Sequence, residues 1–287
     1  MPSGTVIDAW MQHPGQRWLD DEMFASLRRW KRGPFSETAQ PVETTLEMMD
    51  RAGVERGLLC AWWGPSGAMI SNEDVAALCA AHPGRFVGVA SVDLTRPMAA
   101  VAELRRCVET FGFRALRVLP WLWGLAPDDR RYYPLYAACC ELDVTFCTQV
   151  GHAGPLRASA PGRPIPHLDN VALEFPDLRI VGGHIGVPWL DEMISLATKY
   201  PNVYIDTSAY TCARYPAVLV DYLRGHGRRK VLFGSNHPFW PAVDCLAGLD
   251  ALDLDEPTRQ AFLHGNAATV FGLPREAPGT EAGEELP

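Results

Sequence analysis

The sequence predicts an α/β protein that consists of a single (β/α)8 TIM barrel with an insertion after the first strand. Short apolar segments alternate with helical patterns eight times, and a length of 287 residues matches one such barrel. The apolar segments are nearly continuous, as expected for parallel strands that are buried on both faces. An open doubly wound sheet is the alternative, but no glycine-rich turn follows the first apolar segment.

The segments expected to form strands are rich in valine, isoleucine, leucine and phenylalanine. They cover residues 5–10, 56–61, 86–92, 115–119, 144–150, 179–183, 203–206 and 230–233. The expected helices cover residues 41–52, a segment that opens at Ser71, and residues 98–111, 133–142, 166–175, 189–200, 215–224 and 256–271. Gly53 is expected to end the first helix in a left-handed conformation, and Ser71 is expected to cap the second.

Two segments lie outside this alternation. Residues 11–40 form a long insertion, rich in tryptophan and arginine, that we expect to cover the barrel mouth as a partial lid. Residues 276–287 are acidic, contain glycine and proline, and have no apolar period, so we expect a disordered tail. The predicted organisation is one barrel domain over residues 1–275 followed by this tail.

The composition argues against several classes of function. A net charge of −8 disfavours a nucleic-acid partner, and no apolar segment is long enough to span a bilayer. The first residues lack the charged start and apolar run of a signal peptide. Eight cysteines occur without a Cys-x-x-Cys pair, which is typical of buried thiols in a reducing compartment and predicts a cytoplasmic protein.

The candidate site residues follow the expected strands, because the active site of a (β/α)8 barrel lies at the carboxyl ends of its strands. His152 and His184 are the strongest catalytic candidates, since each follows a glycine at a strand end. Asn236 is a third, because its amide can donate a hydrogen bond to an oxyanion. The residues expected to bind substrate are Trp10, Gln12, His13, Trp62, Trp63, Arg117, Trp121, Tyr210, His237 and Trp240.

The tryptophans at the expected mouth indicate a flat apolar pocket for an aromatic or acyl ligand, with packing in the core as the alternative. Arg117 ends the fourth strand, where an arginine suits a carboxylate or carbonyl oxygen. A salt bridge to Asp206 is its alternative role. The basic cluster at residues 28–32 is either a solvated face or a contact for an anionic group such as the phosphate of a carrier.

Four segments carry a resemblance to a known family: residues 6–14, Gly151-His152, residues 182–186 and residues 231–238. They resemble the amidohydrolase superfamily, in its branch of aminocarboxymuconate-semialdehyde decarboxylase, other aromatic-acid decarboxylases and related hydrolases. In that branch the first segment normally carries His-x-His or Glu-x-His, and the last carries Gly-Ser/Thr-Asp. The resemblance implies that His152 matches a metal ligand, and that His184 matches a catalytic acid or base or a polarising residue.

The sequence departs from that pattern at three ligand positions. Trp10 and Gln12 stand where the first pair of ligands belongs, and Asn236 replaces the aspartate. Zinc and manganese sites of this type use histidine nitrogen or carboxylate oxygen. We therefore expect no cofactor; a zinc or manganese ion, if one binds, would use His152 and His184.

These observations predict an amidohydrolase-related hydrolase of a carbonyl-containing aromatic or acyl small molecule. Histidine-assisted water attack, without the usual metal site, would cleave a β-ketoacyl carbon–carbon bond, a lactone or an amide. One alternative is a metal-dependent decarboxylase of an aromatic carboxylic acid, in which the ion anchors the carboxylate. Another is a non-catalytic binding protein. A CoA thioester is among the expected substrates, and the resemblance allows a homodimer.

Overall fold

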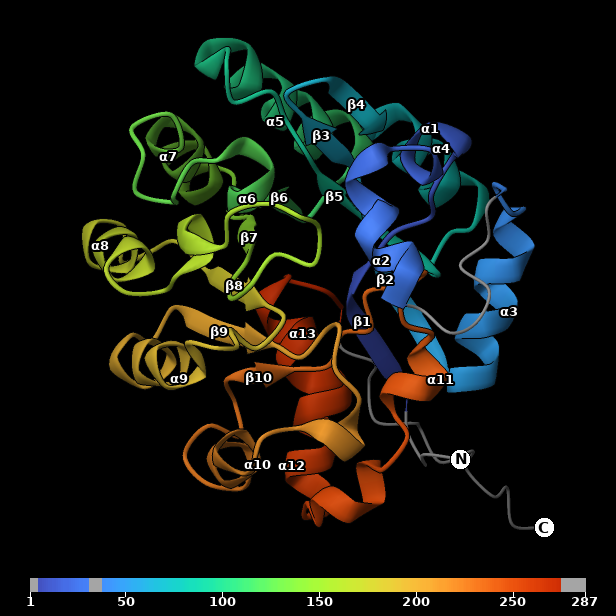
Figure 1. The fold of residues 1–287 in the computed structure, drawn as a ribbon, viewed down its shortest axis with the longest axis vertical. Helices are drawn as coiled ribbons and strands as arrows, with labels where there is room; N and C mark the ends of the chain where they lie inside the picture. Colours follow the sequence, from blue (N-terminus) through green and yellow to red (C-terminus); the bar gives the residue numbers. More distant parts are fainter. Residues whose placement is uncertain (1–4, 31–37, 275–287) are drawn as a thin grey trace, which may run out of the picture.

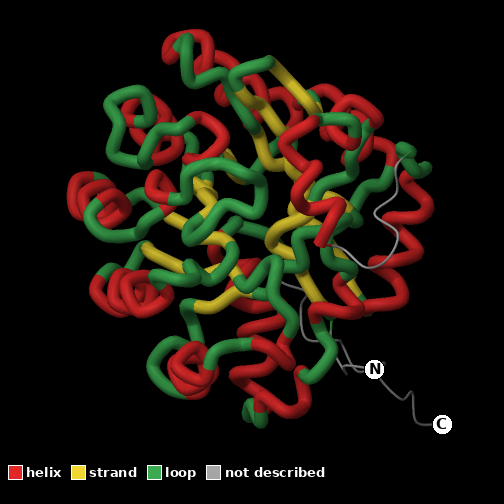
Figure 2. The backbone as a smooth tube through the Cα atoms, viewed as in Figure 1, coloured by secondary structure: helices red, strands yellow, loops and turns green. Residues whose placement is uncertain are grey.

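The computed structural model describes residues 5–30 and 38–274, and within them it forms a (β/α)8 barrel. Eight parallel strands lie at the centre and the helices surround them (Figures 1 and 2). The strands, in their order around the sheet, are β1 (Val6–Met11), β2 (Val54–Cys60), β5 (Phe86–Ala90), β6 (Ala115–Val118), β7 (Thr145–Gln149), β8 (Ile180–Gly183), β9 (Val203–Asp206) and β10 (Val231–Leu232). The predicted fold class is confirmed.

The sheet closes where β1 lies beside β10. The backbone N–H of Ala9 donates to the oxygen of Phe233 at 2.9 Å, and the N–H of Asn236 donates to the oxygen of Trp10 at 2.8 Å. These bonds continue past the short β10 into the loop that follows it. This closure places the residues that follow β1 next to the residues that follow β10 at the barrel mouth.

The helices around the barrel follow the predicted segments to within one or two residues at most ends. They are α3 (Val42–Ala52), α4 (Asn72–Ala81), α5 (Pro97–Phe111), α7 (Tyr133–Glu141), α8 (His167–Glu174), α9 (Leu190–Lys199) and α10 (Ala217–Arg224). Gly53 ends α3 with a φ of 69°, and Ser71 caps α4 in a reciprocal box with Asp74, as predicted. The eighth helix is interrupted: α12 (Glu256–Gln260) and α13 (Asn266–Val270) flank the π-helical segment η5 (Ala261–Gly265).

Short elements occupy the loops. They are η1 (Glu22–Phe24), α1 (Gln16–Leu19), α2 (Ala25–Trp30), α6 (Pro120–Trp123), η2 (Ala160–Gly162), η3 (Cys212–Arg214), α11 (Ala242–Cys245) and η4 (Leu249–Leu252). The hairpin of β3 (Trp62–Gly64) and β4 (Gly67–Ile70) was not predicted. Its strands are only three and four residues long, too short for a periodic pattern.

The insertion packs over the mouth through Trp18, which is fully buried. Its ring centre lies 4.3 Å from that of Phe24, 5.5 Å from Trp62 and 5.0 Å from Phe239. The insertion therefore contacts residues that follow both β2 and β10. Its role as a lid stays a prediction, and the predicted tail at residues 276–287 lies outside the described residues.

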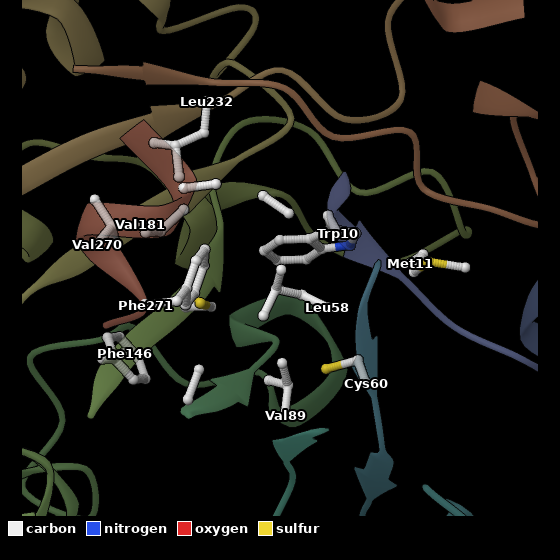
Figure 3. Close-up of a cluster of buried hydrophobic side chains, with 14 of the residues drawn as sticks. Trp10, Met11, Leu58, Cys60, Val89, Phe146, Val181, Leu232, Val270 and Phe271 are labelled. Atoms are coloured by element: carbon white, nitrogen blue, oxygen red, sulfur yellow. The ribbon is translucent and has the colours of Figure 1, made fainter. Parts of the chain in front are cut away.

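The barrel interior is filled by apolar side chains from the strands and from the last helix. Figure 3 shows the indole of Trp10 in the same cluster as Leu58 and Phe271. Trp10 is 2% exposed, so it is a packed core residue as well as a residue at the mouth. Among the described residues, no helix is both long and apolar enough to cross a membrane.

Candidate functional site

Gln12 connects several strand ends at the mouth, and its side chain is fully buried. Its amide nitrogen donates to Asn236 Oδ1 at 3.2 Å and to the backbone oxygen of His237. Its amide oxygen accepts from Trp62 Nε1 at 3.3 Å and from Arg117 Nη2 at 3.2 Å. Both ends of the amide are thus used, and Gln12 links the loops after β2 and β10 to the end of β6.

Arg117 is the buried cation of this site, with an exposed fraction of 3%. Its guanidinium carbon lies 4.6 Å from the ring centre of Trp10 and 5.3 Å from that of Trp62. Burial lowers the pKa of Arg117, yet an arginine stays charged in proteins. Within residues 5–30 and 38–274 no carboxylate forms a salt bridge with it, so the pair with Asp206 that the sequence left open is not found.

His184 stands in a chain of three polar side chains. Its Nδ1 lies 2.6 Å from Ser208 Oγ, and the Ser208 hydroxyl in turn donates to Asp206 Oδ1. Burial, followed by the charge of Arg117 and the neighbouring His152, lowers the pKa of His184 to about 3, so the ring is neutral. Burial raises the pKa of Asp206 to about 7, although the hydroxyl and the amide of Ser208 oppose that rise.

Asp8 joins β1 to the residues after β10 and was not among the predicted site residues. Its Oδ1 accepts from the N–H of Trp10 at 3.1 Å and from the N–H of Ser235 at 2.9 Å, while its Oδ2 accepts from the Ser235 hydroxyl. Burial raises its pKa to about 6. A single charged residue inside an apolar strand is the signal that could have pointed to it.

His152 is exposed and lies at the rim of the site. Its Nδ1 is 3.2 Å from the backbone oxygen of Val187. Its own backbone oxygen accepts from Gln149 Nε2 at 3.1 Å, and Gln149 Oε1 accepts from Trp121 Nε1 at 2.7 Å. Trp121 is therefore oriented by the loop that carries His152.

The side chains of the other predicted substrate-binding residues make no hydrogen bond to Gln12 or Arg117 among the described residues. His13 Nδ1 is 2.9 Å from Thr45 Oγ1, which lies 3.1 Å from His237 Nε2, so this trio ties α3 to the mouth. Trp63 and Tyr210 are half-buried and Trp240 is 37% exposed. Of the residues that the structure describes, these last three make no side-chain hydrogen bond within the site.

The donor set does not fit the metal centre that the family resemblance implies. Among the described residues, no group of three or more histidine, cysteine, aspartate or glutamate side chains could hold an ion. Trp10 has no metal-binding atom. The amide oxygens of Gln12 and Asn236 both accept hydrogen bonds within the protein. Zinc and manganese sites of this type use histidine nitrogen or carboxylate oxygen, and these positions offer neither.

A barrel with its polar residues at the carboxyl ends of the strands defines an enzyme scaffold. A family model described as amidohydrolase matches residues 7–273, and the chain belongs to that family. It is 29% identical over 255 residues to gamma-resorcylate decarboxylase of Rhodococcus jostii (strain RHA1), covering 71% of this chain and 76% of the relative.

Solved structures of similar proteins share the barrel. A TIM-barrel protein of Bordetella bronchiseptica is 26% identical, with a TM-score of 0.81 over 94% of this chain and 99% of that one. A dihydroxybenzoic acid decarboxylase of Polaromonas sp. JS666, with bound manganese and the inhibitor 2-nitroresorcinol, is 20% identical, with a TM-score of 0.72 over 94% of this chain and 97% of that one.

These comparisons confirm the predicted family and correct the predicted reaction. The prediction of a hydrolase that attacks with water is wrong, because most of the similar proteins are decarboxylases; the alternative of an aromatic-acid decarboxylase fits them better, and one solved structure of such a decarboxylase contains manganese. The expectation that no cofactor takes part is likewise unsupported. The cytoplasmic location, the CoA thioester substrate and the homodimer stay predictions.

Proposed function

We propose that this chain is a lyase that removes the carboxyl group of a small aromatic carboxylic acid as carbon dioxide. Four relatives at 25% to 29% identity are gamma-resorcylate decarboxylases, and each covers at least 71% of this chain. The observation within the site that carries the proposal is the buried guanidinium of Arg117, which forms no salt bridge with a carboxylate of the described chain, although the charge of Asp206 acts on it. An unpaired buried charge is costly, and an anionic substrate would remove that cost.

The flanking aromatic rings suit the rest of such a substrate. The ring centres of Trp62 and Trp121 lie 6.2 Å apart, and the Trp62 ring also packs against the guanidinium of Arg117. Flat aromatic ligands pack well against indole rings. Arginine binds a carboxylate through two parallel N–H groups. Together these groups would hold a benzoate with its carboxylate toward Arg117.

Decarboxylation also needs a proton, because the carbon that loses carbon dioxide must gain hydrogen. We assign this proton to the chain of Asp206, Ser208 and His184. When Asp206 is protonated, the hydrogen bond between Asp206 and Ser208 reverses, so that Asp206 donates to Ser208 Oγ and the Ser208 hydroxyl donates to His184 Nδ1. His184 Nε2–H then protonates the ring carbon while Ser208 passes its proton to Nδ1 and Asp206 passes its own to Ser208. The carbon–carbon electron pair returns to the ring as carbon dioxide leaves. Solvent then protonates His184 Nε2, and the Nδ1 proton returns through Ser208 to Asp206.

The solved structure of one similar decarboxylase contains manganese, and an ion of this kind would supply a positive charge for an anionic substrate. The residues at the matching positions of this chain do not form a donor set for it. The steps above therefore use only the side chains of this protein.

The test is release of carbon dioxide from hydroxylated benzoates, with 2,6-dihydroxybenzoate first. Each reaction is followed by chromatography of the decarboxylated phenol, once after chelation and once with added manganese. Arg117→Gln should abolish product formation, because it removes the charge. Arg114→Gln is the matched control, since Arg114 is exposed just before β6, at its opposite end. Absence of the phenol product in both metal states would overturn the proposal.

A further inference from the structure

We propose that the guanidinium of Arg117 replaces a divalent metal ion as the group that holds the substrate carboxylate, so that ligand binding needs no metal. The inference rests on the proposed function for the nature of the ligand. It goes beyond the proposed function, because it assigns the binding of the substrate carboxylate to a side chain of this protein and not to a metal ion. The residues that carry it are Trp10, Gln12, Arg117 and Asn236.

The first observation is that the positions of the expected ligands are already engaged. The Gln12 oxygen accepts from Arg117 at 3.2 Å and from Trp62 at 3.3 Å, and the Asn236 oxygen accepts from Gln12 at 3.2 Å. Both acceptor sites of the Gln12 oxygen are used, so an ion could bind it only by displacing one of these hydrogen bonds, whereas the Asn236 oxygen keeps one lone pair and is a neutral, weak ligand. Breaking either hydrogen bond to the Gln12 oxygen would leave a buried donor without its partner, which is unfavourable.

The second observation is that Trp10 and Gln12 support the guanidinium. The Trp10 ring lies 4.6 Å from the guanidinium carbon, and an aromatic face stabilises a cation at that distance. The Gln12 oxygen accepts from one guanidinium nitrogen. Two of the three residues that stand in place of metal ligands therefore contact the guanidinium of Arg117.

The third observation concerns charge. Cys60 and Cys147 are the thiols next to Arg117, and burial raises the pKa of Cys60 to about 12 and that of Cys147 well above its usual range. Both thiols are neutral at physiological pH and do not balance the guanidinium. Asp206 acts on Arg117 through its charge but forms no salt bridge with it, and burial raises the pKa of Asp206 to about 7. A fixed positive charge beside Gln12 attracts an anion and repels a divalent cation.

The test is calorimetric binding of three aromatic carboxylates: benzoate, 2-hydroxybenzoate and 2,6-dihydroxybenzoate. The protein is first stripped with a chelator and then measured with and without added manganese. We expect wild-type affinity for at least one carboxylate to agree between the two states within about twofold, since the guanidinium itself holds the anion. Arg117→Gln should weaken that binding at least about thirtyfold in both states, and Arg114→Gln should leave it unchanged.

Resorcinol, which lacks the carboxylate, separates charge recognition from loss of fold. It should bind wild type and Arg117→Gln equally, and Arg117→Lys should keep part of the carboxylate affinity because it keeps the charge. Binding that appears only with manganese would overturn the inference, and so would failure of all three carboxylates to bind. Unchanged binding in Arg117→Gln would do the same.

The two proposals can fail separately. Metal-independent binding that depends on Arg117, without release of carbon dioxide, would support this inference and remove the proposed function. Manganese-dependent binding together with manganese-dependent release of carbon dioxide would support the function and remove the inference.

Discussion

Gly183, the last residue of β8, has no space for a side chain because Trp10 packs against it. A Cβ atom built at Gly183 would lie 2.5 Å from Cζ3, 2.8 Å from Cε3 and 2.9 Å from Cη2 of Trp10. Trp10 is 2% exposed, and its ring is rigid, so no flexible chain end can move aside. Gly183→Ala should therefore shift the indole, and with it the face on which Arg117 rests.

The magnitude follows from two opposing effects. Adding a methyl group to a filled core costs about 1–3 kcal/mol, whereas alanine lowers the entropy of the unfolded chain by about 0.4–1 kcal/mol relative to glycine. Because three ring atoms are too close, we expect the packing cost to dominate. The net loss in the free energy of unfolding should be about 1–2 kcal/mol.

Urea unfolding followed by circular dichroism measures this loss. Gly15→Ala is the matched control, since nothing lies within 4 Å of a Cβ at Gly15 and its φ of −80° suits alanine. The control should be as stable as wild type or slightly more so. Adding Trp10→Phe to Gly183→Ala should recover at least about 1 kcal/mol relative to additivity, because the smaller ring leaves room. Equal stability of the two alanine variants, or strict additivity, would refute the packing argument.

Three further predictions concern the polar residues at the mouth. Asp8→Ala should lower the free energy of unfolding, measured in urea, by about 2–5 kcal/mol, because the N–H groups of Trp10 and Ser235 lose their acceptor. Asp8→Asn should lower it less, since the asparagine side chain keeps one acceptor oxygen. Equal losses in the two variants would contradict this prediction. The pKa of Asp8 in the folded state, about 6, exceeds its ordinary value of 3.8, so the folded state binds a proton that the unfolded state has already lost. The free energy of unfolding should therefore fall as the pH rises from about 4 to about 6. A flat pH profile that Asp8→Asn does not alter would contradict this prediction. Ser208→Ala should lower the kcat of the decarboxylation about ten- to hundredfold with little change in KM, because it interrupts the proton chain to His184. A variant with a raised KM and an unchanged kcat would indicate that Ser208 contributes to substrate binding instead.

The sequence predicted the barrel well because strand and helix periodicity are local signals. Each buried strand is a short apolar run, and capping residues such as Ser71 and Gly53 mark the helix ends directly. The hairpin after β2 was missed because its register depends on a turn at Gly67, whose φ is 97°, rather than on a periodic pattern. Tertiary contacts of that kind leave little trace in one sequence.

The candidate site was only partly predictable, since its contacts join residues far apart in the chain. Arg117 and Gln12 were named as mouth residues, yet the sequence did not reveal that they bond to each other across 105 positions. Asp8 and Ser235 are 227 positions apart, and neither residue type alone announces such a pair. The predicted hydrolase reaction was wrong for a related reason, because the residues at the ligand positions do not by themselves define the reaction, and most of the similar proteins are decarboxylases.

Trp10, Gln12 and Arg117 form one connected set of contacts at the barrel mouth. Without Trp10 and Gln12, the buried charge of Arg117 would lose an aromatic face and a hydrogen-bond acceptor. In combination, the indole covers the guanidinium face and the Gln12 oxygen accepts its hydrogen bond. The three side chains therefore stabilise one another. A histidine introduced at position 10 or 12 alone would break these contacts without completing a set of metal ligands.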